Sequence, residues 1–131
     1  MQDHRDVERL IQMTLDCGLQ IHRDIGPGLL ESVYENVLGD RLQKLGVKVD
    51  RQKPVNIEID GTRYSDAFRY DLLLADILLV EVKSVARLGP VHVKQTLTYI
   101  RLMNLPYGLL LNFGADTFKQ GIRRVINDRF R

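Results

Sequence analysis

Apolar residues recur at helical spacing through the first third of the chain. Over residues 6–24 they return every three or four positions, which predicts an amphipathic helix. Gly26-Pro27-Gly28 interrupts this pattern, and a second helical pattern covers residues 29–45, where Gly46 supplies a C-terminal stop. We therefore expect two helices before the first strand.

Short extended segments follow the second helix. They are residues 47–51, 54–59 with a continuation at 62–64, 68–74 and 77–85. Asp60-Gly61 is a strong two-residue hairpin signal between two of these segments. The segment 77–85 is continuously apolar until Glu81, as expected of a strand covered on both faces, so we place it at the centre of the sheet.

The last third of the chain predicts a helix, a strand and a further helix. Pro90 suits the first position of a helix that runs to about residue 104, with one apolar stripe for the core. Residues 107–113 form an apolar strand, and residues 118–128 predict a final amphipathic helix. The expected order is α-α-β-β-β-β-α-β-α, an α/β (α+β) arrangement of a mixed sheet flanked by helices.

Length and composition limit the broad class. The 131 residues, of which 44% are hydrophobic, favour a single domain over residues 1–131 with an ordinary core. Cys17 is the single cysteine, so an internal disulfide is excluded and a Cys/His zinc cluster is not expected. The polar first residues and the lack of a long apolar run predict a cytoplasmic protein with no membrane partner.

Net charge does not identify a partner. Nineteen Lys and Arg stand against seventeen Asp and Glu, and a net charge of +2 is too small to indicate nucleic-acid binding. Basic residues gather near the C-terminus, at Lys119, Arg123, Arg124, Arg129 and Arg131. This cluster is explained by a solvated helix face or by a patch that contacts phosphate.

Charged residues inside the apolar strands are the strongest candidates for chemistry. Glu81 and Lys83 share one face of their strand because side chains alternate, and Asp71 lies in the preceding apolar run. Each alone is explained by a surface charge or an ion pair. Two carboxylates that converge repel each other, and only a cation or a proton relieves that repulsion. The combination therefore predicts a metal site beside a functional amine.

The helix that follows this strand carries a polar stripe. His92, Gln95 and Tyr99 lie on one helical face, beside the apolar face. His92 near the helix start suits either phosphate binding or a capping role, and Tyr99 suits either the site or the core.

These residues resemble the PD-(D/E)XK nuclease superfamily. Asp71, the E-x-K triplet at residues 81–83 and the Q-x-x-x-Y at residues 95–99 follow that signature in order. Residues 28–34 (GLLESVY) match G-x-x-E-x-x-Y, the motif of the small prokaryotic GxxExxY family assigned to the same superfamily. The resemblance covers residues 6–128 and implies a restriction-endonuclease-like core. One departure is Tyr70, which stands where the signature has proline.

The resemblance implies a role for each residue. Asp71 and Glu81 would bind Mg²⁺ or Mn²⁺, with the backbone carbonyl of Val82 as a third ligand and Glu31 completing the site directly or through water. Lys83 would position or deprotonate the attacking water, or offset charge in the transition state. Glu35, one helical turn after Glu31, competes with it as the helix carboxylate.

Further roles concern the substrate. Gln95 would orient Lys83 or a metal-bound water, and Tyr99 would contact a phosphate or brace Gln95. His92 would contact a phosphate, and Arg69 would reach a phosphate or pair with Asp71.

Three functions follow from these residues. The first is a metal-dependent nuclease that cuts DNA in preference to RNA by attack of an activated water. The second is a non-catalytic nucleic-acid-binding or regulatory module that keeps the fold, and the third is an oligomeric protein with the polar stripe as its interface. The resemblance also raises the expectation of a homodimer.

Overall fold

The computed structural model describes residues 4–130. Three helices lie in this range: α1 (His4–Ile25), α2 (Glu31–Lys44) and α3 (Pro90–Leu102). The strands of these residues are β1 (Val49–Arg51), β2 (Pro54–Ile59), β3 (Thr62–Arg69), β4 (Leu72–Leu74), β5 (Leu78–Lys83), β6 (Tyr107–Asn112) and β7 (Ile122–Ile126). A single turn of 3₁₀ helix, Lys119–Gly121, precedes β7. None of the helices in this range has the length and apolar character needed to span a membrane.

Five strands form a mixed sheet in the order β1-β4-β5-β6-β7. β5 pairs parallel with β6, and the other neighbours are antiparallel. The α3 crossover makes the parallel pair possible, since parallel neighbours cannot be joined by a tight hairpin. β5 is central, as its continuous apolar run predicted, and the expected mixed sheet flanked by helices is confirmed.

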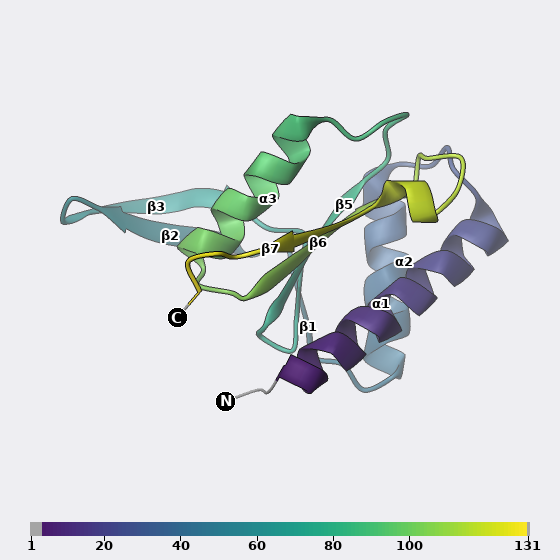
Figure 1. Ribbon diagram of the computed structural model, residues 1–131, viewed down its shortest axis with the longest axis horizontal. Coiled ribbons are helices and arrows are strands. Elements are labelled where there is room, and N and C mark those ends of the chain that lie inside the picture. Colours follow the sequence, from purple (N-terminus) through teal and green to yellow (C-terminus); the bar gives the residue numbers. More distant parts are fainter. Residues whose placement is uncertain (1–3, 131) are drawn as a thin grey trace.

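Helices cover the two faces of this sheet (Figure 1). α1 and α2 pack together on one face, over a core that includes Leu72, Leu78 and Val80. α3 packs on the other face against β6 and β7, and Leu79 and Ile100 belong to that second core. Alternate residues of β5 therefore enter opposite cores, because successive side chains of a strand point to opposite faces.

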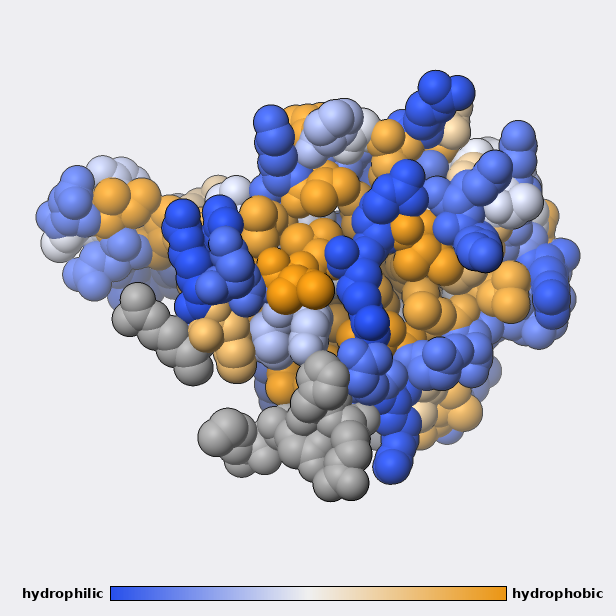
Figure 2. Space-filling view, in the orientation of Figure 1, coloured by the Kyte–Doolittle hydropathy of each residue, from blue (hydrophilic) through white to orange (hydrophobic). Residues whose placement is uncertain are grey.

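The hairpin β2–β3 forms a separate two-stranded sheet that projects away from the helices (Figure 1). Asp60 and Gly61 both have positive φ at its tip, so the predicted hairpin turn is confirmed. Its outer half carries apolar side chains that solvent reaches, among them Ile59 and Tyr64, and Figure 2 shows apolar atoms on this arm. At its base, Phe68 stacks on Tyr99 of α3 with ring centroids 4.0 Å apart.

The predicted final helix over residues 118–128 is wrong. Only Lys119–Gly121 are helical, and β7 then pairs antiparallel with β6. β6 is almost entirely buried, so its backbone groups on the side away from β5 need partners that a helix could not supply. The β-branched Ile122, Val125 and Ile126 suit that strand.

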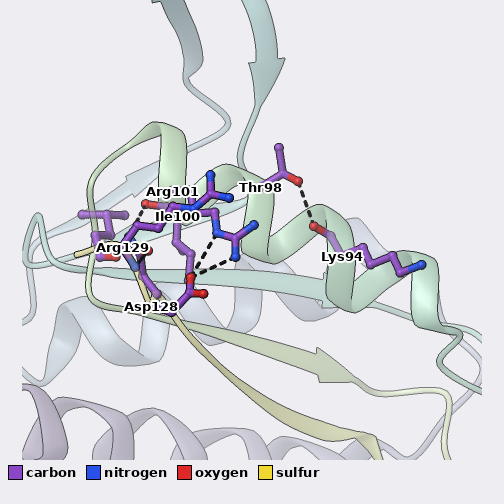
Figure 3. A network of polar contacts seen from close by, with 8 residues as sticks. Lys94, Thr98, Ile100, Arg101, Asp128 and Arg129 are labelled. Carbon is purple, nitrogen blue, oxygen red and sulfur yellow. Dashed lines mark hydrogen bonds and ion pairs between the residues drawn. The ribbon is translucent and has the colours of Figure 1, made fainter.

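Contacts with α3 hold the segment that follows β7 (Figure 3). Arg101 forms an ion pair with Asp128 at 2.9 Å, and the buried Asn127 amide donates to the carbonyls of Ile100 and Leu105. Residues 127 and 128 are thereby held against the helix that follows β5.

Two of the boundaries that differ from the sequence prediction bear on the site. α2 begins at Glu31 instead of Leu29, and the Leu30 side chain is 74% exposed outside the core. The predicted strand 68–74 is divided, because β3 ends at Arg69 and β4 begins at Leu72. This division places Asp71 in the break between two strands.

Candidate active site

Backbone hydrogen bonds lock Asp71 and Glu81 to each other. β4 pairs antiparallel with β5 so that Leu72 lies opposite Val80, which brings Asp71 beside Glu81. The Asp71 N–H donates to Glu81 Oε2 at 2.8 Å, and the Val82 N–H donates to Asp71 Oδ2 at 2.8 Å. The Glu81 carboxylate is therefore held by the backbone of Asp71, and the Asp71 carboxylate is held by the backbone of the residue after Glu81.

Glu81 and Lys83 lie on the face of β5 that α3 covers. Leu79 shares this face, whereas Val80 and Val82 belong to the core beneath α1 and α2. Glu81 is only 3% exposed and Lys83 is half-buried. The predicted shared face is confirmed, but the two side chains form no ion pair, so the ammonium of Lys83 is not neutralised by direct contact with Glu81.

A third carboxylate reaches the site from α2. Gln52 Nε2 donates to Glu35 Oε1 at 2.9 Å and to Asp71 Oδ1 at 3.1 Å. The Gln52 N–H also donates to the backbone carbonyl of Asp71. Gln52 has a φ of +49° in the turn between β1 and β2, and this turn aims its amide between the two carboxylates. Glu35, Asp71 and Glu81 thus form one linked cluster.

Burial raises the pKa values of two of these carboxyls. The pKa of Glu81 rises to about 8, first because burial disfavours its charge and then because the Asp71 charge lies nearby. The positive charge of Lys83 lowers the pKa of Glu81. The pKa of Glu35 rises to about 7, again chiefly through burial, with the Gln52 hydrogen bond lowering it. Near neutral pH, Glu81 therefore keeps most of its proton and Glu35 about half, and a bound cation would displace these protons.

A pocket of about 510 Å³ opens beside this cluster. Glu31, Glu35, Gln52 and Asp71 contribute to its wall together with the loop before α2. Ser84, just after β5, fixes that loop by donating to the Leu29 carbonyl at 2.7 Å.

The Tyr34 side chain also fixes the loop before α2. Its hydroxyl accepts from the Leu29 N–H and donates to the Gly26 carbonyl. The Tyr34 ring is buried and stacks on Phe113 at 4.7 Å. The pocket wall is therefore held at defined positions.

The predicted substrate residues surround the site to different degrees. The pKa of Tyr99 is raised by burial and by the charges of Glu81 and Asp71, so its hydroxyl lies within their field. Gln95 is exposed one turn earlier on α3 and bonds to no side chain of residues 4–130. His92 Nδ1 accepts the Gly89 N–H and caps α3. Arg69 donates to the Gln52 carbonyl.

Glu31 and Glu35 occupy different environments. Glu31 is exposed in the first turn of α2, and its side chain makes no hydrogen bond or ion pair with residues 4–130. Glu35 is buried and reaches Asp71 through Gln52. The role expected of Glu31 stays a prediction, while the structure connects Glu35 to the cluster. Gln52 was absent from the predicted site, because a polar residue between two strands carries no motif.

The carboxylate oxygens of the site are the type of ligand that a hard divalent cation prefers. Asp71 and Glu81 supply oxygen ligands, and Mg²⁺ commonly binds one or two carboxylates while keeping several waters. The raised pKa of the buried Glu81 reflects repulsion and desolvation that a cation relieves. Within residues 4–130, no three His, Cys, Asp or Glu side chains are grouped so that they could hold a metal alone.

Comparison with known proteins identifies the class. A family model described as the PD-(D/E)XK nuclease superfamily matches residues 8–125. The chain belongs to this superfamily, as the ordered motifs predicted, and the superfamily points to a nuclease that acts on nucleic acid with divalent metal.

Other comparisons add little. The search of curated proteins gave no match. The crystal structure of a protein named SSO0001 is similar to this chain. The match covers 90% of this chain and 78% of the SSO0001 chain, at 15% sequence identity and a TM-score of 0.45. At these values the likeness supports no conclusion about this chain.

Proposed function

We propose that this protein is a nuclease that hydrolyses phosphodiester bonds of DNA, in preference to RNA, with Mg²⁺ or Mn²⁺. The observation that carries the proposal is the interlocked pair of Asp71 and Glu81, with Lys83 on the same face of β5. A buried Glu81 beside the half-buried Asp71 is unfavourable for stability, and such arrangements are characteristic of catalytic sites.

Asp71 and Glu81 would hold the cation, with the Val82 carbonyl as a further oxygen ligand. Glu35 would join them through its link to Asp71, and Glu31 would act through water from the pocket wall. A bound Mg²⁺ or Mn²⁺ supplies a Lewis acid for the phosphate and lowers the pKa of a bound water.

The remaining residues would act on the substrate and the water. Lys83 would hold the attacking water or stabilise the negative charge that develops on the phosphate oxygens. Gln95 would orient that water or Lys83. Tyr99, His92 and Arg69 would bind neighbouring phosphates, although His92 and Arg69 already make local hydrogen bonds through one nitrogen.

Membership of the GxxExxY family is part of this proposal. Its support is the way residues 28–34 are used: Gly28 adopts a φ of +117°, Glu31 lines the pocket, and Tyr34 anchors the loop. Gly28 and Tyr34 therefore shape the loop, and Glu31 lies at the pocket that the loop borders.

A non-catalytic module that binds nucleic acid is the second candidate. The observation in its favour is that both carboxylates already accept backbone hydrogen bonds, and that no group of three ligands is assembled within residues 4–130. A fold whose backbone N–H groups already bond both carboxylates can be stable without binding a cation or cleaving a substrate.

One experiment separates the two candidates. Purified protein is incubated with single- and double-stranded DNA and RNA, with Mg²⁺, Mn²⁺ or EDTA, beside Asp71→Ala and Lys83→Ala. Lys94→Ala is the matched control, since this exposed α3 lysine has no side-chain partner in residues 4–130. We expect metal-dependent cleavage by wild type and Lys94→Ala only. Cleavage that survives in Asp71→Ala, or none in wild type, contradicts the enzyme proposal.

Sedimentation of the same preparation tests the expected homodimer. A second copy would double the apparent mass, whereas a monomer at all accessible concentrations would exclude this expectation.

A further inference from the structure

The loop that follows Lys83 also lines a second pocket. Its volume is about 430 Å³. Residues 86–88 form one wall, and the β6–β7 connection with the adjoining ends of these strands forms the other. Ser84, two residues earlier in the same loop, belongs to the carboxylate pocket. Residues of one short loop therefore line both pockets.

The two pockets differ in charge. The carboxylate pocket is lined by Glu31, Glu35 and Asp71 and by no basic residue. The second pocket is lined by Arg87 and Arg123 against the single carboxylate of Asp116. The first attracts cations and the second attracts anions.

Neither arginine of the second pocket is neutralised. Arg87 is exposed and forms no hydrogen bond or ion pair with the side chains or backbone of residues 4–130. Arg123 Nη1 donates to the carbonyls of Gln120 and Ile122, which fixes its guanidinium without removing its charge. Asp116 pairs with neither arginine. A fixed guanidinium beside a free one is suited to recognising an oxyanion, since the planar fork matches phosphate geometry.

The floor of this pocket is rigid. The Asn112 side chain is 1% exposed and joins the two walls. Its Oδ1 accepts the N–H groups of Val85 and Gly114, and its Nδ2 donates to the Val85 carbonyl. Gly114 and Gly121 lie so close to the backbone of Val85 and Asn112 that a Cβ at either would collide. The arginines therefore face a preformed cavity.

We propose that this pocket binds a backbone phosphate of the nucleic-acid strand, through Arg87 and Arg123. The inference rests on the proposed function, because it places a phosphate next to the one that reacts at Asp71 and Glu81. The basic pocket offsets the repulsion between the acidic site and its polyanionic substrate, and the shared loop joins the phosphate contact to Lys83.

Equilibrium binding tests this site. Fluorescence anisotropy of labelled single- and double-stranded DNA is measured in EDTA over a series of salt concentrations. The variants are Arg87→Ala, Arg123→Ala and the charge-conserving Arg87→Lys, with Arg63→Ala on the projecting hairpin as matched control. Each alanine variant is expected to bind about eightfold more weakly near 0.1 M salt, the value for one lost phosphate contact. The slope of log Kd against log salt should fall by about one.

The outcomes separate this inference from the proposed function. Unchanged binding in Arg87→Ala and Arg123→Ala overturns the phosphate site even when wild type cleaves DNA. An equal loss in Arg63→Ala also overturns it, because general charge then explains the effect.

Loss of binding confined to the pocket variants supports the site even when wild type cuts nothing. In that case only the nuclease proposal fails. If wild type binds neither single-stranded nor double-stranded DNA, both the phosphate site and the nuclease proposal are contradicted. Arg87→Ala keeps the test valid if Arg123→Ala unfolds, since the exposed Arg87 side chain makes no hydrogen bond or ion pair within residues 4–130.

Discussion

Replacing Glu81 with Gln should stabilise the protein at alkaline pH. The carboxyl is buried beside Asp71, and its pKa of about 8 lies far above the ordinary value of 4.5. Glutamine is nearly isosteric and keeps an oxygen that can accept the Asp71 N–H. The substitution therefore removes a buried charge without removing the hydrogen bond or leaving a cavity.

The sign follows from proton binding. Between pH 4.5 and about 8 the folded protein keeps a proton on Glu81 that the unfolded chain releases. The free energy of unfolding of wild type therefore falls as pH rises through this window, and the loss is complete above about pH 8. Each pH unit corresponds to about 1.4 kcal/mol, which sets an upper value of about 5 kcal/mol. Coupling with Asp71 and relaxation reduce this, so we expect a gain of about 2–4 kcal/mol.

Urea unfolding in EDTA at pH 5, 7 and 9 measures the effect. The stability of Glu81→Gln should match that of wild type near pH 5 and exceed it progressively toward pH 9. Glu58→Gln, at an exposed carboxylate on β2, is the control and should show no such trend. A stability difference that is independent of pH, or a less stable Glu81→Gln at pH 9, would refute the reasoning.

Added Mn²⁺ should offset most of the stability difference between Glu81→Gln and wild type. Cation binding stabilises wild type by about 2.7 kcal/mol at a hundredfold excess over Kd, and Glu81→Gln loses a ligand and with it most of this gain.

Three further results are expected. Calorimetry of Mn²⁺ binding at pH 7 in buffers of different ionisation enthalpy should detect release of roughly one proton, because the cation displaces the proton of Glu81, and Asp71→Asn should abolish both binding and release. Gly18→Ala should cost about 1–3 kcal/mol in urea unfolding, since its Cβ would collide with the Phe118 ring. Tyr34→Phe should cost about 1–2 kcal/mol, because two backbone groups of the pocket loop lose their shared partner; unchanged stability would contradict that anchoring role.

Most of the candidate site could be read from sequence because its residues lie on regular elements. Glu81 and Lys83 follow strand alternation, and Gln95 and Tyr99 follow helical spacing, so pattern alone placed each pair on one face. Gln52 could not be found in this way. Its amide reaches Glu35 and Asp71 only because the chain turns with positive φ between β1 and β2, and no local pattern encodes that direction.

The sequence by itself determined the two initial helices, the hairpin at Asp60-Gly61, the central β5 and the superfamily. These features depend on periodicity, turn residues and motif order, which are local properties of the chain. Tertiary structure decided that β7 forms one edge of the sheet, and which glutamate of α2 joins the site. Residues 118–128 have a helical pattern but include β7, because the buried β6 requires hydrogen-bond partners along its free edge. Glu35 joins the cluster and Glu31 faces solvent because the packing of α2 on the sheet turns only one of them inward.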